Sequence, residues 1–340
     1  MAWPDIEQGA CTLIVAPDGT GALIDAGTLN ARTPDEDVVS WLGEFSEAHP
    51  GFRLCYVFAT HYHQDHICWI DDIINAGLLA PDGVVYDRGG SYSSGTFSVY
   101  ENAVSPYRRT ISPGQVIDLG DGATLKCLVA AGRVYEDGSI STSDENNLSL
   151  GFLLSYDDFQ LWVEGDLERE MEELAKDVIG DVDVYVVHHH GSSTSSTFSF
   201  CNAVKPEVAV CQVGKNTYGH PSLLTTACIL KTRDTDGDPD NGTPMLILQN
   251  QGSYFAQYPK VYIADPDGEG PQPGTVELHT DGTTYTITAP GFPGPISLST
   301  DGVGVTESPA TTETPTPPTP PAPPRQCTVS VILEAVQLIY

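Results

Sequence analysis

The chain has 340 residues, of which 46 are acidic and 15 are basic, so its formal net charge is −31. A charge this negative repels polyanions at long range, which argues against a broad nucleic-acid-binding surface but not against a local basic site. No apolar run approaches the roughly 20 residues of a membrane-spanning helix. None of the eight cysteines forms a Cys-x-x-Cys pair, which argues against a structural cysteine–zinc site.

The first 60 residues predict strands and a helix in alternation. Residues 11–15 and 22–27 are apolar runs joined by an Asp-Gly turn, which is the pattern of a β-hairpin. Residues 34–47 carry apolar side chains at helical spacing, and residues 53–59 are a short apolar run typical of a buried strand.

The segment after this strand concentrates the chemistry of metal ligands. His61, His63, Asp65 and His66 place three imidazoles and one carboxylate within six residues. Neutral imidazole nitrogen and carboxylate oxygen are good ligands for zinc and its neighbours. The alternative is a set of solvated loop histidines. Because apolar residues recur at helical spacing after Asp65, the cluster lies at a strand-to-helix junction, which favours a metal site.

Residues 81–115 are rich in Gly, Ser, Tyr and Pro, and they predict an irregular loop region with short strands that covers a binding cleft. The rest of the chain alternates strands and helices, which indicates layered α/β packing. Further strands are predicted at 116–129, 148–154, 159–163, 182–187, 208–213, 245–249, 260–263, 275–279 and 284–288, and helices at 167–179 and 223–230.

The expected domain organisation is a single large domain followed by a linker. The parts are a domain over 1–290 with insertions near 81–115 and 234–258, an irregular extension over 291–307, a Pro/Thr-rich linker over 308–325 and a tail over 326–340. The tail is too short to fold alone, so we expect either the start of a further module or a strand that docks back. Such linkers commonly join the modules of exported enzymes, so we expect an extracellular or periplasmic protein whose leader is absent from this chain.

Several predicted strands are followed directly by residues with ligand or acid–base chemistry. These residues are Asp25, Asp166, the run His188–His190, and His220. In layered α/β folds, ligands gather at the carboxyl ends of the strands, so we expect all of these residues to meet the histidine cluster at one edge. Asp166 alone would suit a helix N-cap, and His220 before a proline would suit a turn, but their common position favours a site.

At this point the chain resembles the metallo-β-lactamase-fold hydrolases. The resemblance rests on His61-x-His63-x-Asp65-His66, with Asp25 before it and Gly165-Asp166 and His189 after it. Finer motifs resemble the soluble hydrolase domain of competence DNA-uptake channel proteins, over roughly residues 5–290. These motifs are Asn146-Asn147-Leu148-Ser149-Leu150, Glu164-Gly165-Asp166-Leu167-Glu168, His189-His190-Gly191-Ser192 and Gly214-Lys215-Asn216 through Gly219-His220-Pro221-Ser222.

The resemblance implies an α/β protein with the four-layer αββα sandwich of the metallo-β-lactamase fold and a two-metal site between the sheets. It implies that His61 and His63 bind one metal, that Asp65, His66 and His189 bind the second, and that Asp166 bridges both. Asp25 would support the loop from behind. Many relatives supply a further histidine to the first metal, whereas this chain has Asn146-Asn147 there, so Asn147 or water is expected to complete that site.

Other residues are expected to contact substrate or to support the site. His220 and Lys215 are candidates for holding a substrate anion or protonating a leaving group, with Asp65 orienting the attacking hydroxide. His190 would face the substrate, Ser192 would donate a hydrogen bond to it, and His188 would be structural.

The expected function is that of a metal-dependent hydrolase using two divalent ions, zinc first and manganese or iron as alternatives, with a hydroxide bridging them. Phosphodiester bonds, as in a nuclease or phosphodiesterase, are the first expectation for its substrate. Lactone, ester or thioester hydrolysis at the same metals is the alternative, and a non-catalytic metal-binding module of an exported multidomain protein is the third. The net charge favours a small molecule or short anionic substrate and disfavours a long nucleic acid.

Overall fold

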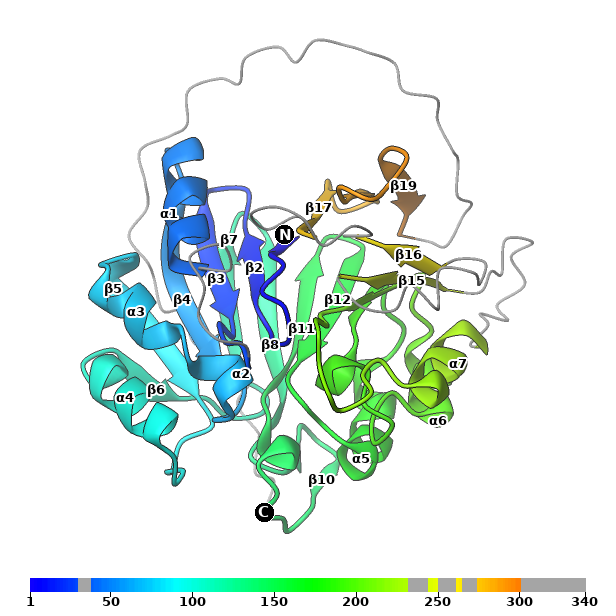
Figure 1. Cartoon of the computed structure of the whole chain (residues 1–340), viewed down its shortest axis with the longest axis horizontal. Coiled ribbons are helices and arrows are strands. Elements are labelled where there is room, and N and C mark those ends of the chain that lie inside the picture. Colours follow the sequence, from blue (N-terminus) through cyan, green and yellow to red (C-terminus); the bar gives the residue numbers. More distant parts are fainter. Residues whose placement is uncertain (30–37, 232–243, 250–260, 265–273, 301–340) are drawn as a thin grey trace, which may run out of the picture.

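The computed structural model describes residues 1–29, 38–231, 244–249, 261–264 and 274–300. Two mixed β-sheets face each other in the middle of the molecule, and helices cover their outer faces (Figure 1). This is the four-layer α/β sandwich that the resemblance predicted. Among the described residues, none of the helices has the length and apolar character to cross a membrane.

The first sheet contains the strands of the first 110 residues and the last described strands. Its order is β19-β18-β17-β1-β2-β3-β4-β5-β6. The bounds are β1 Ala2–Trp3, β2 Thr12–Val15, β3 Thr20–Ile24, β4 Arg53–Ala59, β5 Leu79–Asp87, β6 Arg108–Thr110, β17 Val276–Thr280, β18 Thr284–Thr288 and β19 Ile296–Ser299. β2 and β3 form the predicted antiparallel hairpin, and β3 to β6 are parallel neighbours.

The second sheet comes from the middle of the chain. Its order is β10-β9-β8-β11-β12-β13-β14-β15-β16, with β7 paired to β8. The bounds are β7 Val116–Gly120, β8 Ala123–Ala130, β9 Arg133–Val134, β10 Gly138–Ser139, β11 Gly151–Tyr156, β12 Phe159–Glu164, β13 Val184–Val186, β14 Val208–Cys211, β15 Met245–Leu248 and β16 Val261–Ile263. The strands from β12 to β16 are parallel, so their carboxyl ends lie at one edge.

Helices bury one face each against the outside of a sheet. α1 Val38–Ala48, α2 Gln64–Ile67, α3 Ile70–Asn75 and α4 Gly95–Val104 belong to the first half, and α5 Arg169–Ile179, α6 Phe198–Val204 and α7 Leu223–Lys231 to the second; short 3-10 turns cover Asn146–Leu148 and His188–Gly191. Between the sheets lies the main core, in which the rings of Phe58 and Phe152 meet with centroids 4.9 Å apart. Burial of this apolar surface holds the layers together.

The prediction for residues 81–115 was right about short strands, but it was wrong about an irregular loop because the segment also contains a helix. β5 continues to Asp87, and α4 and β6 follow it. The helical signal is present in the sequence, because Phe97, Tyr100 and Val104 lie at helical spacing and are buried on one face. Ser94 caps the helix by accepting a hydrogen bond from the Phe97 amide (3.0 Å). The Ser- and Gly-rich composition hid this pattern.

Smaller differences concern element limits. The helix after the histidine cluster is broken into α2 and α3, α6 was not predicted, and the extension over 291–307 contains strand β19. The start of the predicted helix over 34–47, most of the insertion near 234–258, the linker and the tail lie outside the described residues.

Candidate metal site

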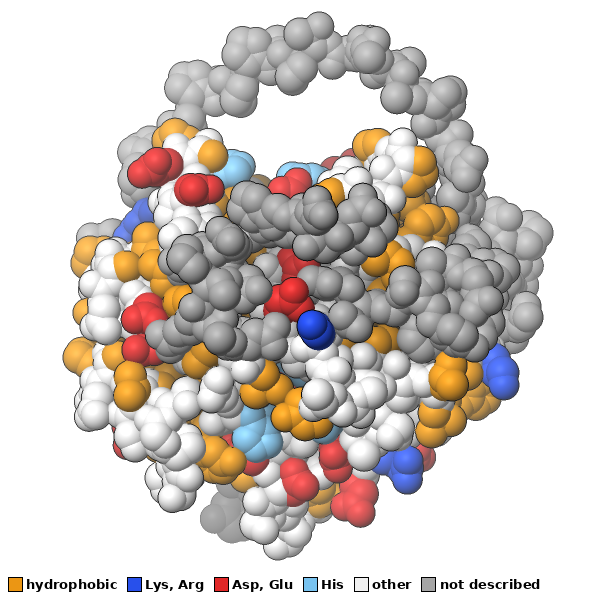
Figure 2. Space-filling model, in the orientation of Figure 1, with side chains coloured by type: hydrophobic (Ala, Val, Ile, Leu, Met, Phe, Trp, Pro, Cys, Tyr) orange, Lys and Arg blue, Asp and Glu red, His pale blue; other side chains and the backbone are white. Residues whose placement is uncertain are grey.

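The candidate residues lie where parallel strands end. Asp25 follows β3, the segment Thr60–His66 follows β4, Asp166 follows β12, the run His188–His190 follows β13, and His220 lies in the segment after β14. On the face shown in Figure 2, histidine side chains reach the surface with acidic side chains near them. Two buried groups form there, and they share one carboxylate.

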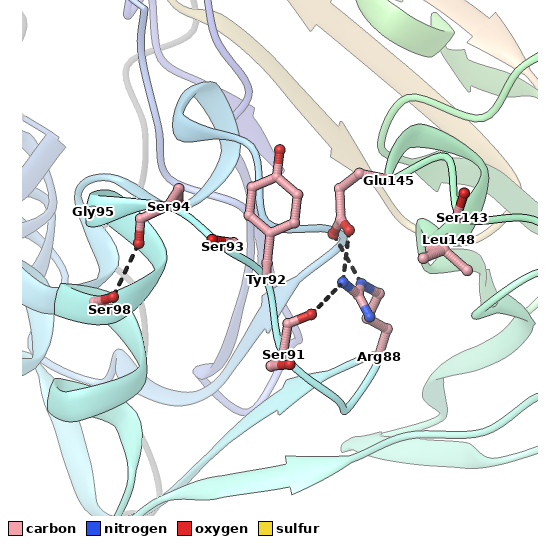
Figure 3. Close-up of a pocket in the computed structure, with 10 residues that line it drawn as sticks. All are labelled: Arg88, Ser91, Tyr92, Ser93, Ser94, Gly95, Ser98, Ser143, Glu145 and Leu148. Atoms are coloured by element: carbon pink, nitrogen blue, oxygen red, sulfur yellow. Dashed lines mark hydrogen bonds and ion pairs between the residues drawn. The ribbon is translucent and has the colours of Figure 1, made fainter.

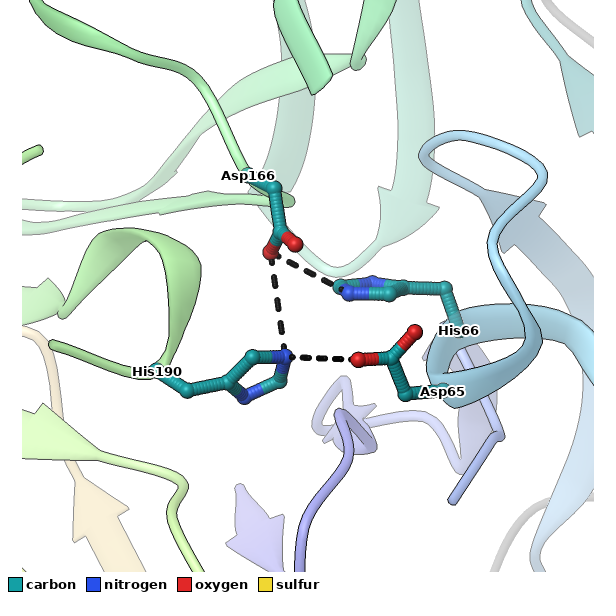
Figure 4. A group of neighbouring side chains, drawn as sticks. All are labelled: Asp65, His66, Asp166 and His190. Atoms are coloured by element: carbon teal, nitrogen blue, oxygen red, sulfur yellow. Dashed lines mark ion pairs between the residues drawn. The ribbon is translucent and has the colours of Figure 1, made fainter. Parts of the chain in front are cut away.

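The larger group consists of Asp65, His66, Asp166 and His190, whose ligand atoms lie within 4.8 Å of one another (Figure 4). Nε2 of His66 is 3.1 Å from Oδ1 of Asp166. Nε2 of His190 is 3.8 Å from that oxygen and 3.5 Å from Oδ2 of Asp65. All four residues are buried. Two imidazoles and two carboxylates therefore converge from both sheets on one point.

The smaller group consists of His61, His63 and Asp166. Nε2 of His61 lies 3.8 Å from Oδ2 of Asp166 and 3.0 Å from Nδ1 of His63. Asp166 thus turns Oδ1 toward one group and Oδ2 toward the other. A carboxylate placed in this way can bridge two metal ions.

These residues fit a metal for a reason that is independent of the family resemblance, namely their buried polar atoms that make no hydrogen bond. Nε2 of His66, Oδ1 of Asp166 and Nε2 of His190 are buried and make no hydrogen bond within the described part of the chain. Buried polar atoms without partners are costly, and native proteins rarely keep them. Imidazole nitrogen and carboxylate oxygen are ligands that zinc accepts. A divalent cation would satisfy all three atoms together.

Asp25 supports this group from behind. Its carboxylate accepts hydrogen bonds from the amide and the hydroxyl of Thr60, each at 2.7 Å, and its Oδ2 lies 2.7 Å from Nδ1 of His66. A carboxylate bound to one ring nitrogen orients the other nitrogen toward a metal. Asp25 therefore contacts the ring nitrogen of His66 that faces away from Asp166.

Charge and burial oppose each other at these groups. Burial raises the pKa of Asp25 and lowers the pKa of His61 well below its usual value. Burial also disfavours the charged form of Asp166, but His66 and His189 outweigh it and hold the pKa of that carboxyl well below its ordinary range. For His66, the carboxylates of Asp166 and Asp25 outweigh burial and raise its pKa. The cluster is thus a tightly coupled set of opposite charges.

His189 and His190 lie in positions that differ from those we expected. His190 joins the larger group, whereas His189, which we expected to bind the second metal, is outside both compact groups. Its Nε2 lies 3.6 Å from Oδ2 of Asp166, and its side chain is 18% exposed. Both residues have positive φ, 51° at His189 and 52° at His190, so the backbone turns sharply between them. His188 is fully buried, as a structural residue should be.

A cavity of about 320 Å³ opens onto the two groups. His63, Asp65, Asp166, His189 and His190 line it together with His220, as do Gln8, Leu29, Gln64, Asn146 and Tyr218. The His220 ring lies 5.5 Å from the ring of His189, and its Nδ1 is buried without a partner among the described residues. Burial, followed by the nearby His189 and His190, lowers the pKa of His220 to about 4.

Three expected substrate or support residues do not line this cavity. Lys215 is exposed, and its amide donates to Glu7 Oε2 at 2.8 Å. The Ser192 hydroxyl pairs with Thr194 at 3.0 Å. Asn147 accepts from the amide of Glu168 at 3.1 Å, which ties its turn to the chain after Asp166. The neighbouring Asn146 lines the cavity instead.

Sequence reasoning missed a buried polar network behind the site. Nδ1 of His188 lies 2.8 Å from Glu172, and its Nε2 accepts from the indole of Trp162 (2.9 Å) and lies 3.2 Å from Glu164. Glu172 also accepts from the amides of Ser196 and Thr197. A glutamate among the apolar positions of α5 is a weak signal of this network in the sequence.

Comparison with known proteins agrees with this geometry. The family described as the metallo-beta-lactamase superfamily matches residues 4–121. ComE operon protein 3 of Bacillus subtilis is 28% identical over 283 residues, which are 77% of this chain and 34% of that protein. Recombination protein 2 of Haemophilus influenzae is 30% identical over 225 residues, 62% of this chain and 24% of that protein.

A relative that is named for a different activity is also similar. Atrochrysone carboxyl ACP thioesterase AgnL7 of Paecilomyces divaricatus is 28% identical over 144 residues, 42% of this chain and 39% of that protein. The chain thus spans less than half the length of each of these three relatives. Residues 4–121 thus match the metallo-beta-lactamase superfamily, and the two-sheet fold and the order of the site residues along the chain agree with that match.

Proposed function

We propose that the chain is a dinuclear-metal-dependent hydrolase that cleaves phosphodiester bonds in small substrates. The observation that carries this proposal is the orientation of Asp166, whose two oxygens face two separate groups of imidazoles. Such a shared carboxylate is suited to two metal ions that act on one bond. Zinc is our first expectation for both ions, because the donors are nitrogen and oxygen.

We assign the candidate ligands to two metal positions. His61, His63 and Asp166 would hold the first ion, and Asp65, His66, Asp166 and His190 would hold the second. When bound, a pair of divalent ions supplies an activated water and stabilises the charge that develops on the bond under attack.

The chain's own residues around the cavity would position the substrate. Asp65 lines the cavity, and its Oδ2 lies 3.5 Å from His190, so it can accept a hydrogen bond from a water that enters the site. His189 and His220 also line the cavity, with their rings 5.5 Å apart, so they can hydrogen-bond to substrate oxygens. Asp65 and Asp166 are buried, and their shielding from bulk water strengthens electrostatic contacts with substrate.

The comparisons bear on two classes of substrate. Recombination protein 2 of Haemophilus influenzae has a name that refers to recombination, a process of DNA, and its similarity covers 62% of the chain, whereas the similarity to the ACP thioesterase covers 42%. The net charge of −31 favours a short substrate over a polymer. Thioester or lactone hydrolysis at the same metals is the second candidate, because of the thioesterase similarity.

A substrate panel tests this proposal. Zinc- or manganese-loaded protein would be given a nitrophenyl phosphodiester, a short single-stranded DNA, a lactone and a thioester. We expect turnover of the phosphodiester, loss of at least 100-fold in kcat/KM in His63→Ala, and normal activity in His279→Ala, whose side chain is 78% exposed on β17. Turnover of the thioester or lactone alone would move the assignment to the second candidate. Equal activity in His63→Ala would refute a metal-dependent reaction.

A further inference from the structure

A second and larger cavity, of about 910 Å³, lies beside the metal site (Figure 3). Its lining is dominated by hydroxyl groups, from Ser91, Ser93, Ser94, Ser98, Ser143 and Tyr92. We call it the serine groove. Its volume falls in the range of sites that bind small organic ligands.

The serine groove and the metal cavity share a wall. Tyr92 lines the groove, and its ring lies 5.7 Å from that of His63, edge to face, while His63 lines the metal cavity. Glu145 lines the groove, and the next residue, Asn146, lines the metal cavity. The two cavities therefore adjoin each other at Tyr92 and at the Glu145–Asn146 pair.

The shared wall is also connected to a metal-binding loop. Glu145 accepts a hydrogen bond from the amide of Tyr62 at 2.9 Å, and Tyr62 lies between His61 and His63. The guanidinium of Arg88 lies over the Tyr62 ring, 4.1 Å from its centroid. A ligand in the groove would therefore touch the same pair of residues that holds the first histidines in place.

The side chains that line the groove carry no net charge. Arg88 donates from Nε and Nη2 to the two oxygens of Glu145, at 2.9 and 2.6 Å, and both side chains are over 90% buried. No other described lining residue is charged. A phosphate would find no unpaired cation there and would meet a carboxylate, so the occupant carries no charge.

The chemistry of the remaining lining narrows the class of ligand. Figure 3 shows the Tyr92 ring standing between the α4 serines and the Arg88–Glu145 pair. Aromatic rings beside hydroxyl groups suit a planar group with polar edges, because bases stack on tyrosine and hydrogen-bond to hydroxyls. An acyl chain would need an apolar lining, and Leu148 is the sole aliphatic residue in the described lining.

We propose that the serine groove binds an uncharged nucleoside portion of the substrate while its phosphodiester lies at the metal groups. This inference rests on the proposed function, and it specifies the substrate as a short nucleotide. Tyr92 would stack on the base, and the serine hydroxyls would contact the base edge and sugar.

Binding of adenosine to the metal-free protein, measured by calorimetry, tests the groove without depending on catalysis. We expect saturable binding that is weakened about five-fold or more in Tyr92→Ala and at least ten-fold in Ser98→Trp, which fills the groove. Val99→Trp is the matched control, because Val99 is the next residue of α4, is 52% exposed and does not line the groove. Circular dichroism and melting curves would verify that each variant is folded.

The outcomes separate this inference from the proposed function. Absence of adenosine binding, or binding that Tyr92→Ala and Ser98→Trp leave unchanged, would overturn the nucleoside assignment even where the metal-loaded protein cleaves a phosphodiester. Binding of inorganic phosphate that Ser98→Trp abolishes would overturn it too, since the groove would then hold an anion. Groove-dependent adenosine binding without phosphodiester cleavage would support the groove and refute the proposed reaction.

Discussion

Asp25 and His66 form a contact of 2.7 Å between Oδ2 and Nδ1, and this contact turns the other ring nitrogen of His66 toward Asp166 at 3.1 Å. Neither Asp25 nor His66 lines the cavity. The pair therefore acts on the site through the orientation of the His66 ring.

Replacing Asp25 by Asn should weaken metal binding. An amide that donates to Nδ1 of His66 would place the ring proton on Nε2, which then cannot bind a cation. Loss of such a supporting partner typically costs 10- to 100-fold in affinity, and we expect a decrease of about that size for zinc. Competition with a chelator measures it. Asp118→Asn, a control on an exposed strand position, should leave the affinity unchanged; equal affinity in Asp25→Asn would contradict this role.

Replacing Asp166 by Asn should reduce the number of metals bound. The carboxylate faces both groups, so its loss removes a shared ligand and the negative charge that offsets the surrounding histidines. We expect elemental analysis to give close to two metals per wild-type chain and one or fewer in the variant. A variant that retains two tightly bound metals would show that Asp166 is not their bridge.

Glu172→Ala should destabilise the protein. Glu172 is fully buried and accepts from the amide of Thr197 at 3.0 Å and from His188 at 2.8 Å. Removing it leaves buried donors without an acceptor, which typically costs on the order of 3 kcal/mol. Urea denaturation measures the loss. Glu173→Ala is the matched control on the same helix, since that side chain is 57% exposed, and a similar loss there would contradict the explanation.

Stability should depend on the ionisation of Asp183, which lies before β13. Burial, reinforced by Asp181 and Asp158, raises the pKa of Asp183 to about 7, compared with about 3.9 in an unfolded chain. Between these pH values the folded state holds a proton that the unfolded state releases. The contribution of this group to stability is therefore favourable at low pH and is lost as the pH rises toward 7.

Asp183→Asn removes that titration and can keep the acceptor for the amide of Gln160, which is 2.7 Å away in the wild type. The melting temperature of the variant relative to the wild type should thus rise between pH 5 and pH 8. Asp118→Asn, at an exposed position of β7 that does not contribute to the pKa of Asp183, serves as the control. A difference that stays constant across this range would show that Asp183 is already ionised when folded.

The ligand chemistry and the strand framework could both be predicted from the amino-acid sequence. The apolar runs at β4 and β12 indicated buried strands, and the residues that follow them carry imidazole and carboxylate groups. Because the carboxyl ends of parallel strands meet at one edge, the convergence could be predicted without coordinates. The apolar spacing of α4 also predicts a helix. The Ser- and Gly-rich composition of this segment favours a loop, and the helix was therefore not predicted.

The folded structure was needed to show which of two adjacent histidines joins the buried group. His189 and His190 have the same side chain, so the direction of each depends on the backbone, which has positive φ at both residues. It likewise decided that Lys215 lies outside the cavity and that the oxygens of Asp166 face different groups. The physical reason is that spacing along a chain identifies the strand end from which a residue comes, whereas loop dihedrals and packing between the two sheets set where its atoms point.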